Sequence, residues 1–252
     1  MVALVRRGVR PARPGWLLVV STCLGAACGR IGYDPLSHAS DASGDSGAND
    51  VLDGLLARYT FDDGITHDSG GAHDALCDDG CPALDPAGFS GAALAMNGGP
   101  AHLQVLANGA FNTPQGFTVT GWVRYRAITA RTCIMTKPIL GTSNSWALCT
   151  DADRRPFFFA CDACDSVFAP DPVEVDTWIH LAGSYDGTLK RFYVDGVAVG
   201  SAPGEVTFNN SAVVIGGDDD NGFGFATDGL IDDLRIYGRV LGDAEIAVVA
   251  GR

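Results

Sequence analysis

The sequence predicts an all-β domain made of many short strands. Residues 178–199 carry the clearest pattern, because Ile179 and Leu181 alternate with residues of different character, as in a strand with two unlike faces. Asp186-Gly187 and Asp195-Gly196 then supply turns, and valines flank the second pair, which is the strongest short signal for a β-hairpin. The 33 glycines among 252 residues also favour an all-β fold, since glycine accepts the positive φ that tight turns require.

The N-terminal segment is predicted to be a targeting signal rather than a folded element. Four arginines precede an apolar stretch at residues 16–24, which is too short to span about 30 Å of hydrocarbon as a helix. The following Leu24-Gly25-Ala26-Ala27-Cys28 resembles the lipobox of a bacterial lipoprotein signal peptide. That resemblance implies removal of residues 1–27 and lipidation of Cys28. A plain secretory signal is the alternative.

The segment that follows, residues 28–50, is predicted to be a disordered acidic tether. Residues 34–50 contain one large apolar side chain, so this segment buries too little surface to offset the entropy of ordering. We expect the folded domain to occupy residues 51–252.

The charge of the chain argues against nucleic acid as a partner. The formal net charge is −13, and loss of residues 1–27, which carry four arginines and no acid, takes it to −17. Such a surface repels a phosphate backbone.

Several further segments of the domain have strand-like patterns, and one near the end resembles a short capped helix. Gly242 stands at the N-cap of that helix and Glu245 at its third position. The predicted strands lie within residues 55–61, 91–98, 117–123, 146–149, 157–161, 213–217 and 229–237.

Three motifs in the central stretch resemble a known family. Trp178-x-His180-x-Ala182, Tyr185-Asp186-Gly187 and the run from Phe192 to Gly196 are similar to the signature of laminin-G-like domains of the concanavalin A-like group. Five separate segments between residues 55 and 251, of which this central stretch is one, resemble the family and occur in the family's order. The resemblance implies an antiparallel jelly-roll β-sandwich with a short C-terminal helix. It also implies a glycan or a protein as ligand, and it does not identify the ligand-binding residues.

The sequence favours a binding module over an enzyme. Retaining glycanases of this fold carry two glutamates on one strand in the pattern Glu-x-Asp-x-x-Glu. Glu174-Val175-Asp176 begins such a pattern, but Ile179 stands where the second glutamate would be. His180 lies among apolar strand residues, so we expect it to be packed or hydrogen-bonded in the interior rather than to act as a base.

A structural calcium ion is implied by the resemblance. Related sandwiches bind Ca²⁺ between the acidic loop after the first strand and an aspartate on the closing strand. The matching positions are Asp62 and Asp233, with Asp63 or Asp68 as further ligands. The alternative is that these are ordinary solvated turn residues. The loop at residues 218–222 superficially resembles a calcium loop, but it is better explained as a solvated loop.

An exported chain with an even number of remaining cysteines is predicted to form disulfides. The simplest scheme pairs neighbours, and a bond between Cys149 and Cys161 competes with it. The local pairs are Cys77–Cys81, Cys133–Cys149 and Cys161–Cys164.

We therefore predict a non-catalytic glycan- or protein-binding module, lipid-anchored at the outer membrane or cell surface. Two alternatives stay open: an envelope structural or adhesion protein that binds no small glycan, and a polysaccharide-active hydrolase with an unrecognised site. Exposed aromatic rings would favour glycans, because sugars stack on them. The sequence does not say whether Trp122, Trp146 or Trp178 is exposed.

Overall fold

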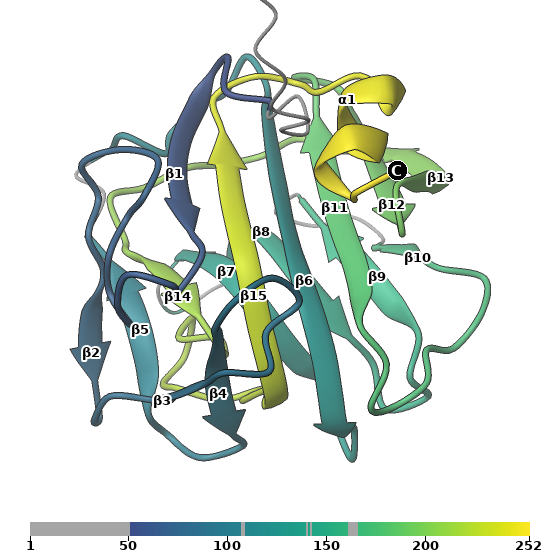
Figure 1. The fold of residues 1–252 in the computed structure, drawn as a ribbon. Helices are drawn as coiled ribbons and strands as arrows, with labels where there is room; N and C mark the ends of the chain where they lie inside the picture. Colours follow the sequence, from purple (N-terminus) through teal and green to yellow (C-terminus); the bar gives the residue numbers. More distant parts are fainter. Residues whose placement is uncertain (1–50, 107–108, 140, 142, 161–165) are drawn as a thin grey trace, which may run out of the picture. The chain divides into compact units, whose positions relative to one another are not determined.

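The protein is a β-sandwich. The fold is taken from a computed structural model, which describes residues 51–106, 109–139, 141, 143–160 and 166–252. These residues form two sheets that pack face to face (Figure 1), and their strand pairings are antiparallel. The antiparallel jelly-roll sandwich implied by the family resemblance is therefore confirmed.

The first sheet has eight strands. They are β1 (Leu55–Tyr59), β3 (Ala83–Asp85), β4 (Ala93–Asn97), β6 (Phe117–Ala127), β11 (Ile179–Tyr185), β12 (Leu189–Val194), β13 (Val197–Pro203) and β15 (Asp228–Tyr237). Their order is β13-β12-β11-β6-β15-β4-β3, and β1 pairs with the second half of β15. The first and closing strands of the domain thus lie side by side, as the family resemblance implied.

The second sheet has seven strands. They are β2 (Leu76–Asp78), β5 (His102–Val105), β7 (Thr132–Ile139), β8 (Ser143–Thr150), β9 (Pro156–Phe159), β10 (Val167–Phe168) and β14 (Val213–Ile215). Their order is β10-β9-β8-β7-β14-β5-β2, so β14 joins the hairpin β7–β8 to strands from much earlier in the chain.

Aromatic side chains from both sheets form the centre of the core. Phe117 on β6 contacts Trp146 on β8 and Phe158 on β9, with ring centroids 6.2 and 6.3 Å apart. Gly183 on β11 lies so close to Phe158 that a Cβ there would come within 2.3 Å of the ring. Glycine is required at this position because the two sheets approach each other over that ring.

The central hairpin follows the sequence prediction. Ile179 and Leu181 on β11 enter the core, while His180 and Ala182 face the other side of the sheet. The turn to β13 has positive φ at both central residues, 49° at Asp195 and 76° at Gly196. This geometry matches the twist of a two-residue hairpin.

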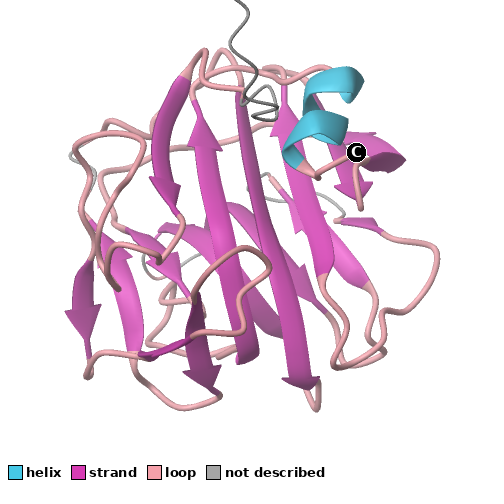
Figure 2. Cartoon of the chain, viewed as in Figure 1, coloured by secondary structure: helices cyan, strands magenta, loops and turns pink. Residues whose placement is uncertain are grey.

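Among the described residues a single short helix packs at one end of the first sheet (Figure 2). Helix α1 (Asp243–Val249) begins after Gly242, whose N–H donates to the Glu245 carboxylate over 2.9 Å, as the predicted capping pattern requires. Ile246 packs against Tyr193 and Tyr237 on the sheet. None of the helices in the part of the chain that the structure describes has the length and apolar character of a membrane span.

Two of the predicted disulfides are present, Cys77–Cys81 and Cys133–Cys149. The second bond joins the adjacent strands β7 and β8 and contradicts the alternative pairing of Cys149 with Cys161. Cys161 and Cys164 lie outside the described residues. So do residues 1–50, and with them the predicted signal peptide, the acidic tether and the lipidation site Cys28.

Candidate functional site

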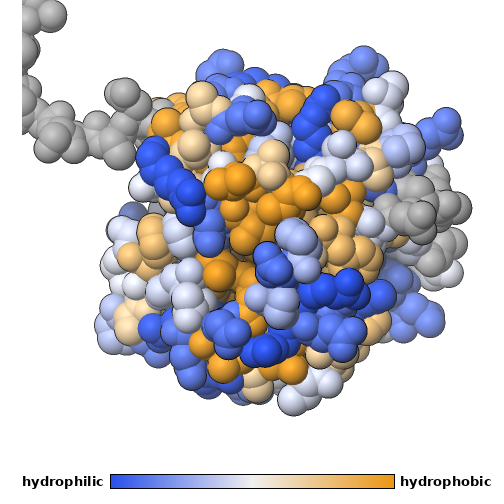
Figure 3. Space-filling view, turned by 90° about the vertical axis from the view of Figure 1, so that its right-hand side faces the viewer, coloured by the Kyte–Doolittle hydropathy of each residue, from blue (hydrophilic) through white to orange (hydrophobic). Residues whose placement is uncertain are grey.

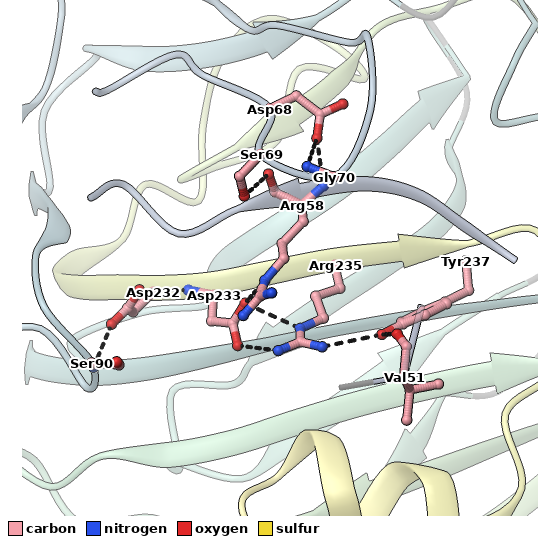
Figure 4. Close-up of polar contacts among 10 residues, drawn as sticks. All are labelled: Val51, Arg58, Asp68, Ser69, Gly70, Ser90, Asp232, Asp233, Arg235 and Tyr237. Carbon is pink, nitrogen blue, oxygen red and sulfur yellow. Dashed lines mark hydrogen bonds and ion pairs between the residues drawn. The ribbon is translucent and has the colours of Figure 1, made fainter. Parts of the chain in front are cut away.

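Asp233, the closing-strand residue of the predicted calcium site, contacts two arginines. It lies at a bulge of β15, where Arg58 Nε donates to its Oδ1 over 2.8 Å and Arg235 Nη2 to its Oδ2 over 2.7 Å (Figure 4). Burial alone would raise the pKa of Asp233, but the hydrogen bonds and charges of Arg235 and Arg58 outweigh it and lower this pKa. The negative charge of Asp233 is therefore balanced by guanidinium groups.

The other three predicted calcium ligands have different surroundings. Asp68 is buried and accepts the backbone N–H groups of Arg58 and His73, so it holds its own turn together. Asp62 accepts the N–H of Ala92 over 2.8 Å, and Asp63 is exposed. Within the described ranges, no three or more His, Cys, Asp or Glu side chains are grouped so that they could hold a metal ion. The calcium ion stays a prediction.

The three tryptophans that the structure describes do not form an open platform for a sugar. Trp146 is in the core, and Trp122 is covered by Phe89, whose ring stacks on it with centroids 3.5 Å apart. Trp178 is half-buried and has the guanidinium of Arg124 over its ring. The loop that carries Phe89 is held by Asp232, whose carboxylate accepts the Ser90 N–H over 3.0 Å. Aromatic rings available to a ligand must therefore be sought elsewhere.

His180 is packed in the interior, as predicted, but its ring is not hydrogen-bonded. The side chain is fully buried beside Trp122, and neither ring nitrogen has a partner within the described structure. Burial lowers the pKa of His180 to about 3, so the ring is neutral. A neutral imidazole without access to solvent is not placed to act on a substrate.

A pocket of about 180 Å³ lies on the outer face of the seven-stranded sheet. Inward and outward residues alternate along β8: Trp146 and Leu148 join the core, while Ala147 and Cys149 face outward. The Cys133–Cys149 disulfide and Ala147 line the pocket. On this face they pack with Phe157 of β9, so one side of the pocket is apolar.

The rim of the pocket is aromatic and carries one cation. The guanidinium carbon of Arg131 lies 5.4 Å from the ring centre of Phe157 and 5.2 Å from that of Phe225. Phe225 is 42 % exposed and has a positive φ of 49°, a rare conformation for a bulky residue. The N–H of Cys133 donates to its carbonyl oxygen over 2.8 Å. Strained backbone of this kind is concentrated at functional sites.

Polar side chains also line the pocket, and two of them are buried. Asn144 on β8 donates through Nδ2 to Asp218 Oδ2 over 2.7 Å. Asn144 Oδ1 and Asp218 Oδ1 are both shielded from solvent and have no hydrogen-bond partner in the described part of the chain. Burial raises the pKa of Asp218. Ser143, Ser166 and Asp220 are further polar residues that line the pocket.

The loop at residues 218–222 is thus not fully solvated, which corrects the sequence interpretation. Asp218 is only 4 % exposed, because its loop folds over Asn144 and forms an isolated β-bridge between Asp218 and Gly224. Sequence reasoning found none of the pocket's polar or aromatic residues as a site. The only local signal was the run Phe157-Phe158-Phe159, in which alternation places the outer two rings on the outward face.

A second recess, of about 320 Å³, lies between Ala169–Thr177 and the start of β13. It is lined by Val173, Ile179, Val194 and Val199 among others. Apolar side chains gather on this side of the sandwich (Figure 3), where Val197 is 52 % exposed. Apolar areas of this kind are frequent in protein contacts.

An antiparallel sandwich with a pocket on an outer sheet face defines a class of domains that includes both sugar-binding modules and glycanases. The chain belongs to the concanavalin A-like lectin/glucanase superfamily, whose family model matches residues 97–247. No curated protein sequence matches the chain.

Solved structures with a similar fold come from several organisms. Domain 4 of the extracellular arabinanase AbnA from Geobacillus stearothermophilus, solved with arabinotriose, is 23% identical with a TM-score of 0.65, covering 78% of this chain and 98% of that one. The binding domain of Paraclostridial Mosquitocidal Protein 1 is 14% identical with a TM-score of 0.63, and the match covers 79% of this chain and 52% of that one. A Trypanosoma rangeli sialidase in complex with a difluorinated nononic acid is 17% identical with a TM-score of 0.60, and the match covers 78% of this chain and 32% of that one. The chain therefore spans about half of the toxin domain and a third of the sialidase.

Proposed function

We propose that this protein is a non-catalytic glycan-binding module, anchored by a lipid on Cys28 at the outer membrane or cell surface. The observation that carries the proposal is the pocket on the seven-stranded sheet, which combines aromatic rings with polar groups. Glycan sites use this combination, because sugar rings stack on aromatic faces while their hydroxyls require hydrogen-bond partners. The similar arabinanase domain, which was solved with arabinotriose, supports the proposal.

The carboxylates around the pocket favour binding over hydrolysis. A retaining glycosidase needs a nucleophile and an acid about 5–5.5 Å apart. None of the three glutamates of the chain lines the pocket: Glu245 caps the helix, Glu174 pairs with Arg154, and Glu205 is exposed.

One of the two aspartates that line the pocket is engaged within the protein. Asp218 is tied to the amide of Asn144. Release of new reducing ends from a panel of polysaccharides by the wild-type protein would replace the binding proposal with the hydrolase alternative.

Screening the full chain on a glycan array tests the proposal. Phe225→Ala removes an exposed ring at the pocket, so we expect several-fold to about tenfold weaker binding of every glycan that the wild type retains. Phe89→Ala is the matched control, because Phe89 is 44 % exposed against 42 % for Phe225 but lies in a loop that packs on Trp122 of the other sheet. Equal loss in both variants, or no glycan bound by the wild type, would refute the proposal.

An envelope adhesion protein that binds no small glycan is the second candidate. The apolar area beside β13 is the observation that favours it, since such a surface is suited to a protein partner. This function predicts that no glycan on the array binds and that cross-linking in native cells gives a specific protein adduct. Val197→Asp should abolish that adduct, whereas Phe225→Ala should leave it unchanged.

A further inference from the structure

One edge strand of the first sheet is open to pairing with another chain. β13 ends that sheet (Figure 1), and among the described residues it pairs only with β12. An edge strand presents a row of backbone N–H and C=O groups without partners, on which a further strand can form. Four of the seven residues of β13 are exposed, and these are Val197, Ala198, Ser201 and Pro203. The edge is therefore accessible along most of its length.

The other edges of the two sheets are protected, and β13 is not. β3, β2 and β10 have only three, three and two residues, and very short edge strands offer few groups for pairing. The backbone of Arg58 on β1 is hydrogen-bonded to Asp68 and Ser69 of the loop that follows. β13 carries no charged side chain, and only a bulge opposite β12 and the terminal Pro203 interrupt it. This contrast indicates an edge that receives a partner.

The recess beside β13 is suited to the side chains of an added strand. Val199 of β13 lines the recess together with Val173, Ile179 and Val194, and it packs against the core between the sheets. Side chains of a strand alternate between the two faces of its sheet. Every second residue of a strand added to β13 therefore points to the face on which Val199 lies. Apolar residues at those positions would be buried in the recess.

The charged residues that line the recess are all acidic. They are Asp171, Glu174 and Asp195. Glu174 is paired with Arg154 over 3.2 Å, whereas Asp171 is exposed and Asp195 accepts only the backbone N–H of His180 in the described structure. The whole chain also carries a formal net charge of −13. Lysine or arginine at the ends of the added strand complements these charges, and an acidic strand is repelled.

The same charges argue against a second copy of this chain as the partner. In a two-fold antiparallel pair of β13 strands centred on Gly200, Asp195 of each copy would face Glu205 of the other. Like charges placed directly opposite each other destabilise a strand pair. The partner strand must therefore come from a different chain.

We propose that β13 pairs with an extended segment of another protein, in which apolar residues alternate with other residues and lysine or arginine lies at the ends. The segment extends the first sheet by one strand and places its apolar side chains in the recess. This inference does not depend on glycan binding at the pocket of the seven-stranded sheet. It defines the chemistry of a protein partner for the surface beside β13.

Peptide selection on the immobilised full chain tests the inference. The probe is a displayed library of random short peptides, and we expect the enriched sequences to alternate apolar residues between lysines or arginines. Replacing the basic residues of an enriched peptide by glutamate should weaken binding by about tenfold or more, and added salt should weaken binding of the basic form. No enrichment, or enrichment of acidic peptides, would overturn the inference.

Methylation of the peptide backbone tests strand pairing directly. Successive N–H groups of a strand point to opposite edges, so an enriched peptide is resynthesised with one or the other alternate set of nitrogens methylated. One set should weaken binding by about tenfold or more, because those N–H groups donate to β13. The other set should leave the affinity unchanged. Equal affinities of the two methylated peptides would show that the peptide does not bind as an added strand.

Matched variants of the protein locate the site. Val197→Ser should weaken an enriched peptide by about three- to tenfold, because an exposed apolar side chain is lost from the edge. Leu76→Ser is its control, since Leu76 is 54 % exposed against 52 % for Val197 and lies on the short edge strand β2. Asp171→Asn should weaken binding by about two- to fivefold, with the exposed Asp79→Asn as its control. Equal effects in variant and control would contradict the proposed site.

Two further measurements separate this inference from its alternatives. Sedimentation should show a monomer, and a dimer that Val197→Ser dissociates would identify a second copy as the partner and overturn the inference. Phe225→Ala should bind the enriched peptides as the wild type does, because Phe225 lies at the pocket of the other sheet. Glycan binding without peptide binding would overturn this inference and leave the proposed function intact. Urea unfolding of each variant checks that the fold is retained.

Discussion

Replacing His180 by leucine should make the protein less sensitive to acid. The ring is fully buried, and neither of its nitrogens has a hydrogen-bond partner among the described residues. Burial lowers the pKa of His180 from 6.5 to about 3. Between these two values the folded protein keeps the ring neutral, while the unfolded chain binds a proton.

The sign and size of the effect follow from this difference. A depressed folded-state pKa contributes stability that is complete above pH 6.5 and is lost as the pH falls. Each pH unit below 6.5 lowers the free energy of unfolding by about 1.4 kcal/mol, so at pH 4.5 the neutral His180 should have lowered the free energy of unfolding of the wild type by about 2.7 kcal/mol. This value does not depend on the folded-state pKa as long as that pKa lies below about 4.

Urea unfolding at pH 7.5 and pH 4.5 measures the effect as a difference of differences. The free energy of unfolding should fall by about 2.7 kcal/mol more in the wild type than in His180→Leu. At pH 7.5 the variant should be at least as stable as the wild type, because it removes two buried nitrogens that lack partners. Parallel losses in the two proteins would show that the ring is accessible or hydrogen-bonded and would refute the reasoning.

His102 provides the contrasting case. It is also buried, but its Nδ1 is hydrogen-bonded to the carbonyl oxygen of Pro100 over 2.8 Å. His102→Leu breaks that bond, so the variant should be less stable than the wild type at pH 7.5, by about 1 kcal/mol or more. The opposite responses of the two histidines at this pH would show that hydrogen bonding, and not burial alone, decides the outcome.

Three further predictions concern covalent and ionic links. In the double variant Cys133→Ser/Cys149→Ser the free energy of unfolding should fall by about 3 kcal/mol, the value for a disulfide that closes a loop of this length. The variant should also bind glycans more weakly, because the disulfide lines the pocket. Unchanged stability and affinity would contradict this prediction. If the predicted Ca²⁺ binds, the thermal unfolding midpoint should rise with calcium and fall with chelator, by an amount equivalent to about 2.7 kcal/mol at a hundredfold excess over the dissociation constant. Asp62→Ala should abolish this response. A midpoint that changes with neither calcium nor chelator would mean that these aspartates bind only their amide and arginine partners. Cys28→Ala should remove the protein from the membrane fraction of its native host, and unaltered partitioning would exclude the lipid anchor.

Local sequence determined those parts of the fold in which interacting residues are neighbours in the chain. Asp195-Gly196 defined a hairpin because few other residue pairs accept positive φ at both turn positions. Gly242 and Glu245 defined the start of the helix, and alternation identified which face of β11 enters the core. In each case the interaction that matters spans a few residues, so little information from the rest of the chain is needed.

The family resemblance also predicted the sandwich and the pairing of the first and closing strands. It did not predict which side chains contact each other across neighbouring strands. Asp233 was predicted to be a calcium ligand, and the structure adds that Arg58, 175 residues earlier in the chain, donates to its carboxylate. No periodicity in the sequence encodes which guanidinium group comes to lie against a given carboxylate.

The pocket itself was decided entirely by tertiary structure. Asn144 and Asp218 are 74 residues apart and meet because β14 inserts beside β7 and carries its following loop over β8. That strand order depends on the joint burial of both sheets' inner faces, a property of the whole chain. By itself the sequence determined an all-β chain with its turns, local disulfides and likeness to a family of sandwiches; only the folded arrangement brought two unpaired acceptors and a rim of phenylalanine rings to one place.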